Sequence, residues 1–418
     1  MTLSCFDLGE RMLSVDEARG ALCALVTDAL PAETSALAEL HGRVLARDVM
    51  SPLDVPRHTN AAMDGIALAW PDNVEDASRW ERVGQVRAGT RHDTPLLSGQ
   101  CLGITTGAPL PPGSDTVIMQ EQLEEVGENR VIVDRPDRVR RGQNVRLAGE
   151  DIAAGTLVLP AGTRLSAAEL GVLASLGMAE ALVRRRPRVA IFSTGDEVTA
   201  PGTRLPTANI FDTNRFTLRG LIAEHGGEVI DMGIIPDDLA SLAEALAEAS
   251  DSADLVITSG GVSVGEADFT RAALAQIGEL GFWRIAMRPG RPLACGRLGS
   301  RGTPFLGLPG NPVAVMVTFL QFVVPLLATM QGRDNVKPCR LTALADHALT
   351  CRTGRVDFIR GLYHSDANGT LRVCSTGAQG SGILSSMVKA NCLIEVGEDR
   401  EGVRAGESVT IQPLFRFP

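Results

Sequence analysis

Residues 254–268, DLVITSGGVSVGEAD, decide the fold of the central part of this 418-residue chain. The apolar run at 255–257 predicts a short buried strand, and it leads directly into a pair of glycines. Glycines let main-chain N–H groups approach a ligand closely, and nearby hydroxyls add polar contacts. A tight turn capped by Asp268 explains the same residues, so this stretch alone leaves both interpretations open. The candidate binding residues here are Ser259, Gly260, Gly261 and Ser263.

The pattern of 254–268 extends over 188–330 as an alternation of strands and helices. Strand-like runs lie at 188–194, 228–235, 254–258, 283–287 and 304–308. Amphipathic periodicity lies between several of them, most clearly at 239–246. This alternation predicts an α/β domain with a mostly parallel sheet covered on both faces. Ligands of such sheets bind at the carboxyl ends of the strands.

The loops at those strand ends carry the chemistry. Three of them contain an acid that suits Mg²⁺, which takes oxygen ligands and bridges to substrate phosphates: Glu197, Asp237 and Asp268. Helix capping explains Asp237 and Asp268 equally well. Asn311 precedes Pro312 at a predicted helix start, which leaves N–H groups for an anion. Further binding candidates are Ser193, Thr194, Gly195, Pro309, Gly310 and Asn311.

The rest of the chain predicts three further parts. Residues 12–30 have a helical pattern that starts with a capping box of Ser14 and Glu17, and a second short helix is expected at 32–41. From 51 to 136 the chain shows short β-like runs broken by Pro and Gly. A helix capped by Ser166 with Glu169 is expected at 166–177, and β-like runs after 332 predict a small barrel or sandwich. The predicted domains are 1–50 with 138–181, 51–137, 182–331 and 332–418.

Composition excludes several classes of protein. The chain is 44% hydrophobic and 22% charged with a net charge of −10, as expected of a folded protein that does not bind nucleic acid. Eight scattered cysteines without a CxxC pair indicate reduced thiols in a cytoplasmic protein. No signal peptide is recognised, and there is no Walker A sequence. The apolar run 312–330 contains Thr318, Gln321 and Pro325, which favours a buried helix over a membrane span.

Cationic and hydroxyl side chains near the C-terminal half suit an oxyanion. Arg284, Arg288 and Arg291 follow one another in FWRIAMRPGRP, and guanidinium groups bind oxyanions bidentately. Arg360, Ser381 and Ser385 could add contacts from the last part of the chain. Taken singly, each is explained by an exposed polar position.

The motifs together resemble one family. MDGIA, TTGAPLPPGSDTVIMQE, GEDI, FSTGDEV, DTNR, SGGVSVGEAD, MRPGRP and LGLPGNPVA occur in this order between residues 63 and 314, and the resemblance that they carry extends over about residues 12–415. The chain therefore resembles the molybdopterin molybdenumtransferases, the molybdenum insertases of molybdenum-cofactor biosynthesis, whose animal homologue is the C-terminal region of gephyrin. The resemblance implies a segmented domain, an inserted β-rich domain, a three-layer pterin-binding α/β domain and a C-terminal β-barrel.

The resemblance also implies an activity and partners. Adenylylated molybdopterin and molybdate would be converted, with Mg²⁺, into molybdenum cofactor and AMP by a homodimer. Molybdopterin adenylyltransferase and molybdoenzyme chaperones are further implied partners, without nucleic acid or membrane. The family's functional positions match Asp64, Thr106, Asp151, Glu197, Asp237, Asp268, Arg360 and Ser381, with Glu197, Asp237 and Asp268 at the metal.

Molybdate is expected at Arg288, Arg291, Arg360, Ser381 and Ser385. The family usually has lysines where this chain has Arg284, Arg288 and Arg291, which keeps the charge but changes its geometry. Two alternatives stay open at this stage. One is the adenylyltransferase that activates molybdopterin with ATP, and the other is a noncatalytic, gephyrin-like scaffold.

Overall fold

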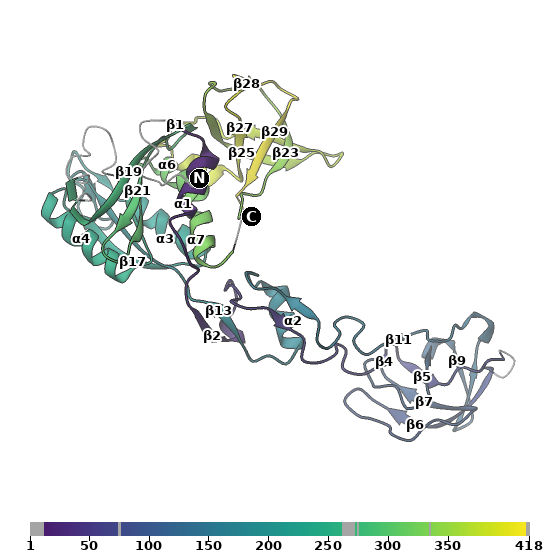
Figure 1. The fold of residues 1–418 in the computed structure, drawn as a ribbon. Helices are drawn as coiled ribbons and strands as arrows, with labels where there is room; N and C mark the ends of the chain where they lie inside the picture. Colours follow the sequence, from purple (N-terminus) through teal and green to yellow (C-terminus); the bar gives the residue numbers. More distant parts are fainter. Residues whose placement is uncertain (1–11, 74–76, 261–271, 274–275, 334–335, 415–418) are drawn as a thin grey trace. The chain divides into compact units, whose positions relative to one another are not determined.

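The computed structural model describes residues 12–73, 77–260, 272–273, 276–333 and 336–414. The chain forms two compact units, one of residues 1–33, 42–46 and 182–418 and one of residues 34–41 and 47–181. Each unit has hydrophobic cores of its own. Figure 1 labels the helices and strands of both units. The four-part division expected from the sequence is finer than these two units and stays a prediction.

The larger unit is built on a seven-stranded sheet. Four neighbouring strands of this sheet run parallel: β17 (Glu228–Ile235), β14 (Arg188–Thr194), β18 (Leu255–Ser259) and β22 (Thr303–Leu308). β21 (Pro292–Leu298) is antiparallel to both of its neighbours, β22 and β19 (Gly278–Ile285). β1 (Met12–Leu13) completes the edge beside β19. The prediction of a mainly parallel sheet is confirmed, although the sequence analysis did not find β21.

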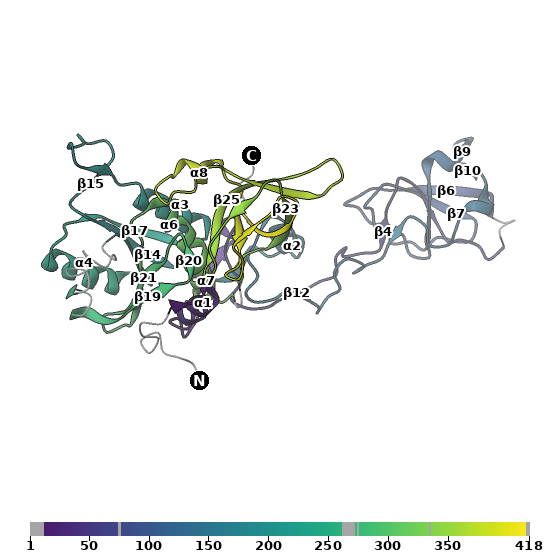
Figure 2. The same ribbon diagram turned by 90° about the horizontal axis from the view of Figure 1, so that it is seen from above.

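Helices cover both faces of this sheet because its buried strands alternate their side chains (Figure 2). Val189 and Ile191 of β14 face a core that α1 (Val15–Cys23) and α3 (Asn214–Glu224) share with the helices after residue 312. Ala190 and Phe192 face the opposite core, which includes α4 (Leu239–Ser252). Successive residues of a strand point to opposite faces, and the result is the expected three-layer domain.

The apolar run Pro312–Met330 is one continuous helical stretch of α6 (Pro312–Thr318), the π-helical η5 (Phe319–Val323) and α7 (Val324–Met330). It is long and apolar enough to cross a membrane, but 83% of it is buried within the structure. Pro325 has no N–H, so the carbonyl of Gln321 loses its usual helical donor. Arg19 of α1 donates its Nε–H to this carbonyl at 3.1 Å. The run is therefore a helix of the hydrophobic core, and Arg19 of α1 donates to the carbonyl that Pro325 leaves without its helical donor.

The N-terminal segment follows the sequence prediction only in part. Ser14 and Glu17 form the expected capping box, but α1 ends at Cys23 rather than near residue 30. The prediction of a helix at 32–41 is wrong. The segment forms β2 (Ala32–Ala36), which pairs with β13 (Glu180–Arg184), followed by a single 3₁₀ turn. Pairing with a strand distant in sequence overrides a weak local helix propensity.

The smaller unit holds a six-stranded, mostly antiparallel sheet. Its strands are β8 (Thr116–Met119), β5 (Gly65–Leu68), β7 (Gln100–Ile104), β6 (Arg79–Val86), β10 (Arg130–Val133) and β9 (Leu123–Val126). Two short antiparallel pairs, β3 (Val49–Met50) with β12 (Leu157–Leu159) and β4 (Asn60–Ala61) with β11 (Val145–Arg146), belong to the same unit. α2 (Ala167–Ser175) starts with the predicted capping box of Ser166 and Glu169.

The C-terminal part of the larger unit is a closed barrel. β25 (Val356–Ser365), β26 (Leu371–Ser375), β23 (Leu341–Ala345), β29 (Ser408–Pro413) and β27 (Cys392–Val396) pair in this order, and β27 pairs again with β25. β20 (Met287–Arg288) leaves the α/β part and pairs in parallel with β25. The predicted β-barrel is confirmed, and β20 places an arginine from the α/β part on its edge.

Candidate active site

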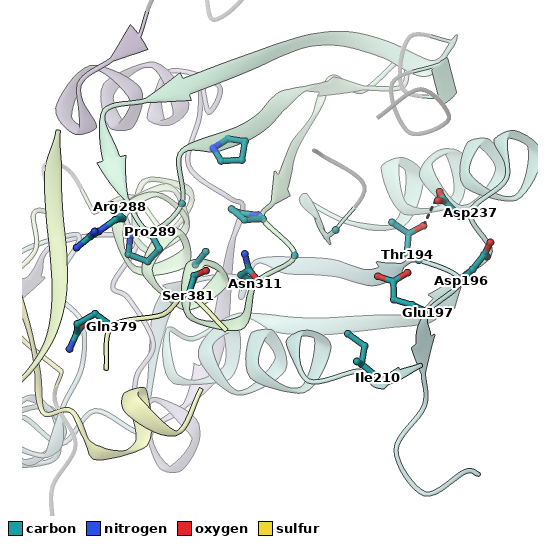
Figure 3. Close-up of a pocket in the computed structure, with 17 residues that line it drawn as sticks. Thr194, Asp196, Glu197, Ile210, Asp237, Arg288, Pro289, Asn311, Gln379 and Ser381 are labelled. Carbon is teal, nitrogen blue, oxygen red and sulfur yellow. Dashed lines mark hydrogen bonds between the residues drawn. The ribbon is translucent and has the colours of Figure 1, made fainter. Parts of the chain in front are cut away.

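A pocket of about 680 Å³ lies in the larger unit at the carboxyl ends of β14, β17, β18 and β22 (Figure 3). Ten of the residues predicted as site residues line it: Thr194, Gly195, Glu197, Asp237, Gly260, Arg288, Pro309, Gly310, Asn311 and Ser381. The pocket therefore lies where a parallel sheet is expected to bind its ligand.

One end of the pocket is acidic. Asp196 and Glu197 follow β14, Asp237 follows β17, and all three side chains gather near Thr194 in Figure 3. The cap of α4 is Asp238, whose Oδ1 accepts the Ser241 N–H at 3.0 Å. Asp237 therefore does not cap the helix, and its Oδ1 lies 3.5 Å from the Thr194 hydroxyl that donates to it.

The loops that form the pocket floor touch one another through glycines. A Cβ on Gly195 would lie 2.6 Å from Oε2 of Glu197, and one on Gly260 would lie 3.0 Å from the carbonyl oxygen of Thr194. Both glycines have positive φ, 132° and 94°, where other residues are strained. Gly310 stands 3.8 Å from the Cα of Gly260 by the same measure. The glycines of the sequence motifs thus bring three strand-end loops together.

The wall between the two ends is formed by the start of α6. Asn311 occupies the N-cap position without a capping hydrogen bond from its side chain, and it faces the pocket. The N–H of Val313 donates to the carbonyl oxygen of Ser381 at 3.0 Å. The expectation of free N–H groups at this helix start is wrong for Val313, because the barrel part already supplies its acceptor.

The opposite end of the pocket is basic. Arg288 of β20 lies there with Gln379 and Ser381. Nη2 of Arg288 lies 3.3 Å from Oδ2 of Asp357, whose side chain is 1% exposed and also contacts Arg355 at 3.0 Å. Arg288 itself is 44% exposed. Asp357 thus holds a solvent-accessible cation at the pocket wall from behind.

Arg360 lies behind this wall and not in the pocket lining. It is 1% exposed, and its guanidinium donates to the Ser386 hydroxyl at 3.1 Å and to the Gly380 carbonyl oxygen at 3.0 Å. Its backbone N–H donates to Oε1 of Gln379 at 2.9 Å. Burial, with a smaller contribution from Arg288, lowers the pKa of Arg360 to about 10. The side chain remains cationic at neutral pH and adds positive charge next to Ser381.

Other predicted residues lie outside the pocket lining. Ser193 and Ser259 are buried, and Ser193 donates its hydroxyl to Asp212 at 3.0 Å. Arg291 has its Nη2 3.8 Å from the sulfur of Met12. Ser385 is exposed at the start of α8 (Ser385–Lys389), where its neighbour Ser386 contacts Arg360 instead. Arg284 is exposed on β19. Gly261, Ser263 and Asp268 lie outside the described residues.

Asp64 and Thr106 form a pair in the smaller unit. Oδ1 of Asp64 accepts the Thr106 hydroxyl at 2.7 Å and the Thr106 N–H at 2.6 Å. The side-chain hydrogen bond, with the backbone one after it, lowers the pKa of Asp64 below its usual value. Asp151 is exposed in the same unit. The two matched residues of NAAMDG and TTGAP are thus direct partners.

Sequence reasoning missed several lining residues. Asp196 stands next to a predicted acid and could have been included, whereas Ile210 enters only because β15 (Val198–Thr199) and β16 (Ile210–Phe211) pair in parallel. Gln379 carries no sequence signal. Its position depends on a distant contact, because its amide group hydrogen-bonds to the backbone N–H and the backbone carbonyl of Arg360. The missed residues are Asp196, Ile210, Pro289, Gly290, Pro292, Ala314 and Gln379.

The acidic end suits a hard cation only with additional ligands. Within the described ranges, no three Asp, Glu, His or Cys side chains converge to hold a metal ion. Mg²⁺ commonly uses one or two carboxylates and completes its shell with substrate phosphates and water. The donor set of Glu197 and Asp237, all oxygen, fits that manner of binding.

Three family models match the chain over most of its length. They are the MoeA N-terminal region (domain I and II) at residues 13–177, the probable molybdopterin binding domain at 190–329 and the MoeA C-terminal region (domain IV) at 342–414. These matches follow the order of the β-rich part, the α/β part and the barrel described above.

Relatives and solved structures agree with these models. A molybdopterin molybdenumtransferase of Haemophilus influenzae is 42% identical over 96% of this chain and 99% of its own. Gephyrin of Dictyostelium discoideum is 32% identical over 88% of this chain and 57% of its own. The crystal structure of a molybdopterin biosynthesis MoeA protein from Pyrococcus horikoshii is 30% identical, covers 96% of this chain and all of its own, and has a TM-score of 0.81. With its three-layer domain, its barrel and its two-ended pocket, the chain belongs to the molybdopterin molybdenumtransferases of molybdenum-cofactor biosynthesis.

Proposed function

We propose that this molybdopterin molybdenumtransferase inserts molybdate into adenylylated molybdopterin with release of AMP, and that both substrates react in the pocket at the strand ends. The observation that carries this proposal is the separation of charge in one pocket. Asp196, Glu197 and Asp237 lie at one end, and Arg288 and Ser381 lie at the other. One pocket can therefore bind a metal-bound diphosphate and an oxyanion at the same time.

The acidic end is assigned to Mg²⁺ and the phosphates of the adenylate. Glu197 and Asp237 would hold the ion, with Asp268 as the third predicted ligand. Bound Mg²⁺ would polarise the phosphoric anhydride for cleavage. Gly195, Gly260 and Gly310 leave backbone bare where the phosphates would lie, and the side chain of Asn311 faces the same space. These groups bind and orient the adenylate.

The basic end is assigned to molybdate. A dianion is repelled by the carboxylates and attracted to cations, so Arg288 and the Ser381 hydroxyl would bind it while buried Arg360 adds positive charge from behind. Asp357 lies within ion-pair distance of the guanidinium of Arg288, at 3.3 Å. Arg291 and Ser385 stay predictions at the margin of this site. The chain's contribution to metal insertion is then chiefly positioning of molybdate beside the pterin sulfurs.

A second copy of the chain completes the site in this proposal. The Asp64–Thr106 pair belongs to the smaller unit, and the ionised carboxylate that Thr106 stabilises suits a role beside the adenylate. We place these groups of one copy at the pocket of the other, in a cytoplasmic homodimer. Molybdopterin adenylyltransferase would supply the adenylate, and molybdoenzyme chaperones would receive the product.

The decisive experiment compares two neighbouring acids. Asp237→Asn should strongly reduce molybdate-dependent AMP release from adenylylated molybdopterin, because it removes a carboxylate from the pocket. Asp238→Asn removes a charge from the same loop but keeps a good cap for α4, and it should retain activity. If Asp237→Asn keeps the wild-type turnover at limiting Mg²⁺, Asp237 is not a ligand of the metal ion.

The alternatives predict different results in the same system. An adenylyltransferase would form the adenylate from ATP and molybdopterin without molybdate. A noncatalytic scaffold would dimerise and bind peptide without releasing AMP. Molybdate-dependent AMP release by the wild-type protein, with no adenylate formed from ATP, excludes both.

A further inference from the structure

The parallel strands β14 and β17 shift register just before they deliver their acids to the pocket. Ile191 pairs with Asp231, but Ser193 pairs with Ile234 and Thr194 with Ile235. β17 therefore contains one extra residue in this interval, which is a β-bulge. Gly233 lies within it at φ 80°, a conformation that favours glycine.

The bulge has a dedicated charged support. Asp231 accepts the Gly233 N–H at 3.0 Å and both of its oxygens accept Nη1 of Arg215, at 2.7 and 2.8 Å. Arg215 also donates its Nε–H to Oδ2 of Asp212 at 2.9 Å. Oδ1 of Asp212 accepts the Ser193 hydroxyl on β14. The guanidinium of Arg215 thus links β17, through Asp231, to the end of β14, through Asp212.

The support is shielded enough to be rigid. The side chains of Asp212, Arg215 and Asp231 are 1%, 12% and 26% exposed. Burial by itself would raise the pKa of Asp231, but the hydrogen bonds from Arg215 and then Gly233 outweigh it and keep the pKa below its usual value. Asp231 is therefore ionised at neutral pH, and Arg215 is its hydrogen-bonded counterion.

The bulge decides which way the end of β17 faces. Side chains alternate along a strand, so a register shift of one residue turns every later side chain to the other face. With the extra residue, Thr194 stands opposite Ile235 and its hydroxyl reaches Asp237 at 3.5 Å. Without it, Asp237 would be displaced relative to Thr194 and to Glu197.

We infer that Arg215, held by Asp212 and Asp231, is a positioning residue that sets the separation of Glu197 and Asp237 and thereby the affinity of the pocket for a divalent cation. This inference rests on the metal role in the proposed function. Arg215 does not line the pocket, so it acts through the strand ends and not by contact with substrate.

The test measures metal binding apart from turnover. In Arg215→Lys the charge remains, but an ammonium cannot bridge two carboxylates in the geometry of the guanidinium fork. We expect the Kd of the full chain for Mn²⁺, followed by electron paramagnetic resonance, to rise about tenfold. The KM for Mg²⁺ in AMP release should rise equally, whereas kcat at saturating Mg²⁺ should change less than about threefold.

A matched control lies at the other end of the same sheet. Arg185 makes a bidentate pair with Asp254, at 2.8 and 2.9 Å, before β14 and β18 begin. Arg185→Lys should lower stability by a similar amount and leave the Mn²⁺ Kd unchanged. Equal metal affinities of Arg215→Lys and Arg185→Lys would overturn the inference.

Two substitutions of Gly233 test the bulge without changing any charge. A Cβ at Gly233 would meet no atom within 4 Å, so Gly233→Ala adds only backbone strain. It should weaken Mn²⁺ binding, and Gly233→Asn should restore it because asparagine tolerates positive φ. If Asp237→Asn leaves Mn²⁺ binding intact, the proposed metal role fails; if it weakens binding while Arg215→Lys and Gly233→Ala do not, only the present inference fails.

Discussion

Arg360→Met should weaken molybdate use and lower the stability of the fold only modestly. The wild-type residue is 1% exposed, and burial is the main reason why its pKa falls below its usual value, to about 10. At about 1.4 kcal/mol per unit of pKa, this lowering disfavours the charged form by about 3 kcal/mol. A buried methionine of similar length removes that cost.

The substitution also removes two charge-assisted hydrogen bonds, to Ser386 and to the carbonyl of Gly380. Together the two contribute about 3–6 kcal/mol, against about 3 kcal/mol of relieved burial. We therefore expect the free energy of unfolding to fall by no more than about 3 kcal/mol, at or below the low end of the 3–5 kcal/mol typical of a broken buried ion pair. Chemical denaturation measures this difference.

The sign of the pH dependence follows from the same pKa. Because the folded-state pKa of Arg360 lies below that of the unfolded chain, the unfolded state binds more protons in the interval above about pH 10. Wild-type stability should gain over that interval relative to Arg360→Met, and the two should differ by a constant amount below it. The difference between variants isolates this one group.

Function supplies the refuting result. Loss of one cation beside the oxyanion should raise the molybdate concentration for half-maximal AMP release at least about tenfold, or about 1.4 kcal/mol. Arg372→Met is the control, because Arg372 pairs with Asp346 on the barrel and does not line the pocket. The reasoning would be refuted if the free energy of unfolding of Arg360→Met fell by more than about 3 kcal/mol while its molybdate requirement stayed unchanged. Arg360 would then have a structural role only.

Three further outcomes are expected. Gly260→Ala should lower the free energy of unfolding by about 1–2 kcal/mol in chemical denaturation, because its Cβ would lie 3.0 Å from the Thr194 carbonyl oxygen at φ 94°. Gly220 of α3 has open space around it, so Gly220→Ala should instead raise the free energy of unfolding by about 0.5–1 kcal/mol. Thr106→Val should raise the pKa of Asp64 toward its usual value in a carboxyl NMR titration, and the stability that Asp64 contributes above about pH 4, lost as pH falls through its lower folded pKa, should shrink. An unchanged titration would contradict the assigned hydrogen bond. Phe322→Ala, at 0% exposure in the main core, should destabilise the larger unit by about 3–5 kcal/mol, measured by its thermal transition.

Much of this architecture is predictable because its signals are local. The apolar run of β14, the capping boxes of Ser14 and Ser166 and the glycines of the strand-end loops each follow from neighbouring residues, and all appear in the structure as expected. The order of strands and helices then implies a parallel sheet, and a parallel sheet implies where its ligand binds.

The remaining features depend on contacts between distant residues. Nothing in AETSA, the sequence of β2, predicts that it will pair with β13, and no local pattern reveals that Asp238 rather than Asp237 caps α4. The place of Arg360 behind the pocket wall, and of Gln379 in front of it, follows from how β25 and the loop at 376–381 pack together. Such assignments require the fold, because each residue type suits several positions.

The edge strand β1 has a consequence for synthesis on the ribosome. Met12 pairs with Arg284 and Leu13 with Ile285, so this edge strand waits for a partner translated some 270 residues later. At roughly 5–20 residues per second, that delay is roughly 15–55 s. The smaller unit, complete at residue 181, emerges entirely within this interval and can fold first. The apolar face of α1 lacks its packing partners in the main core until α7 has been made, and chaperones can bind it during that time.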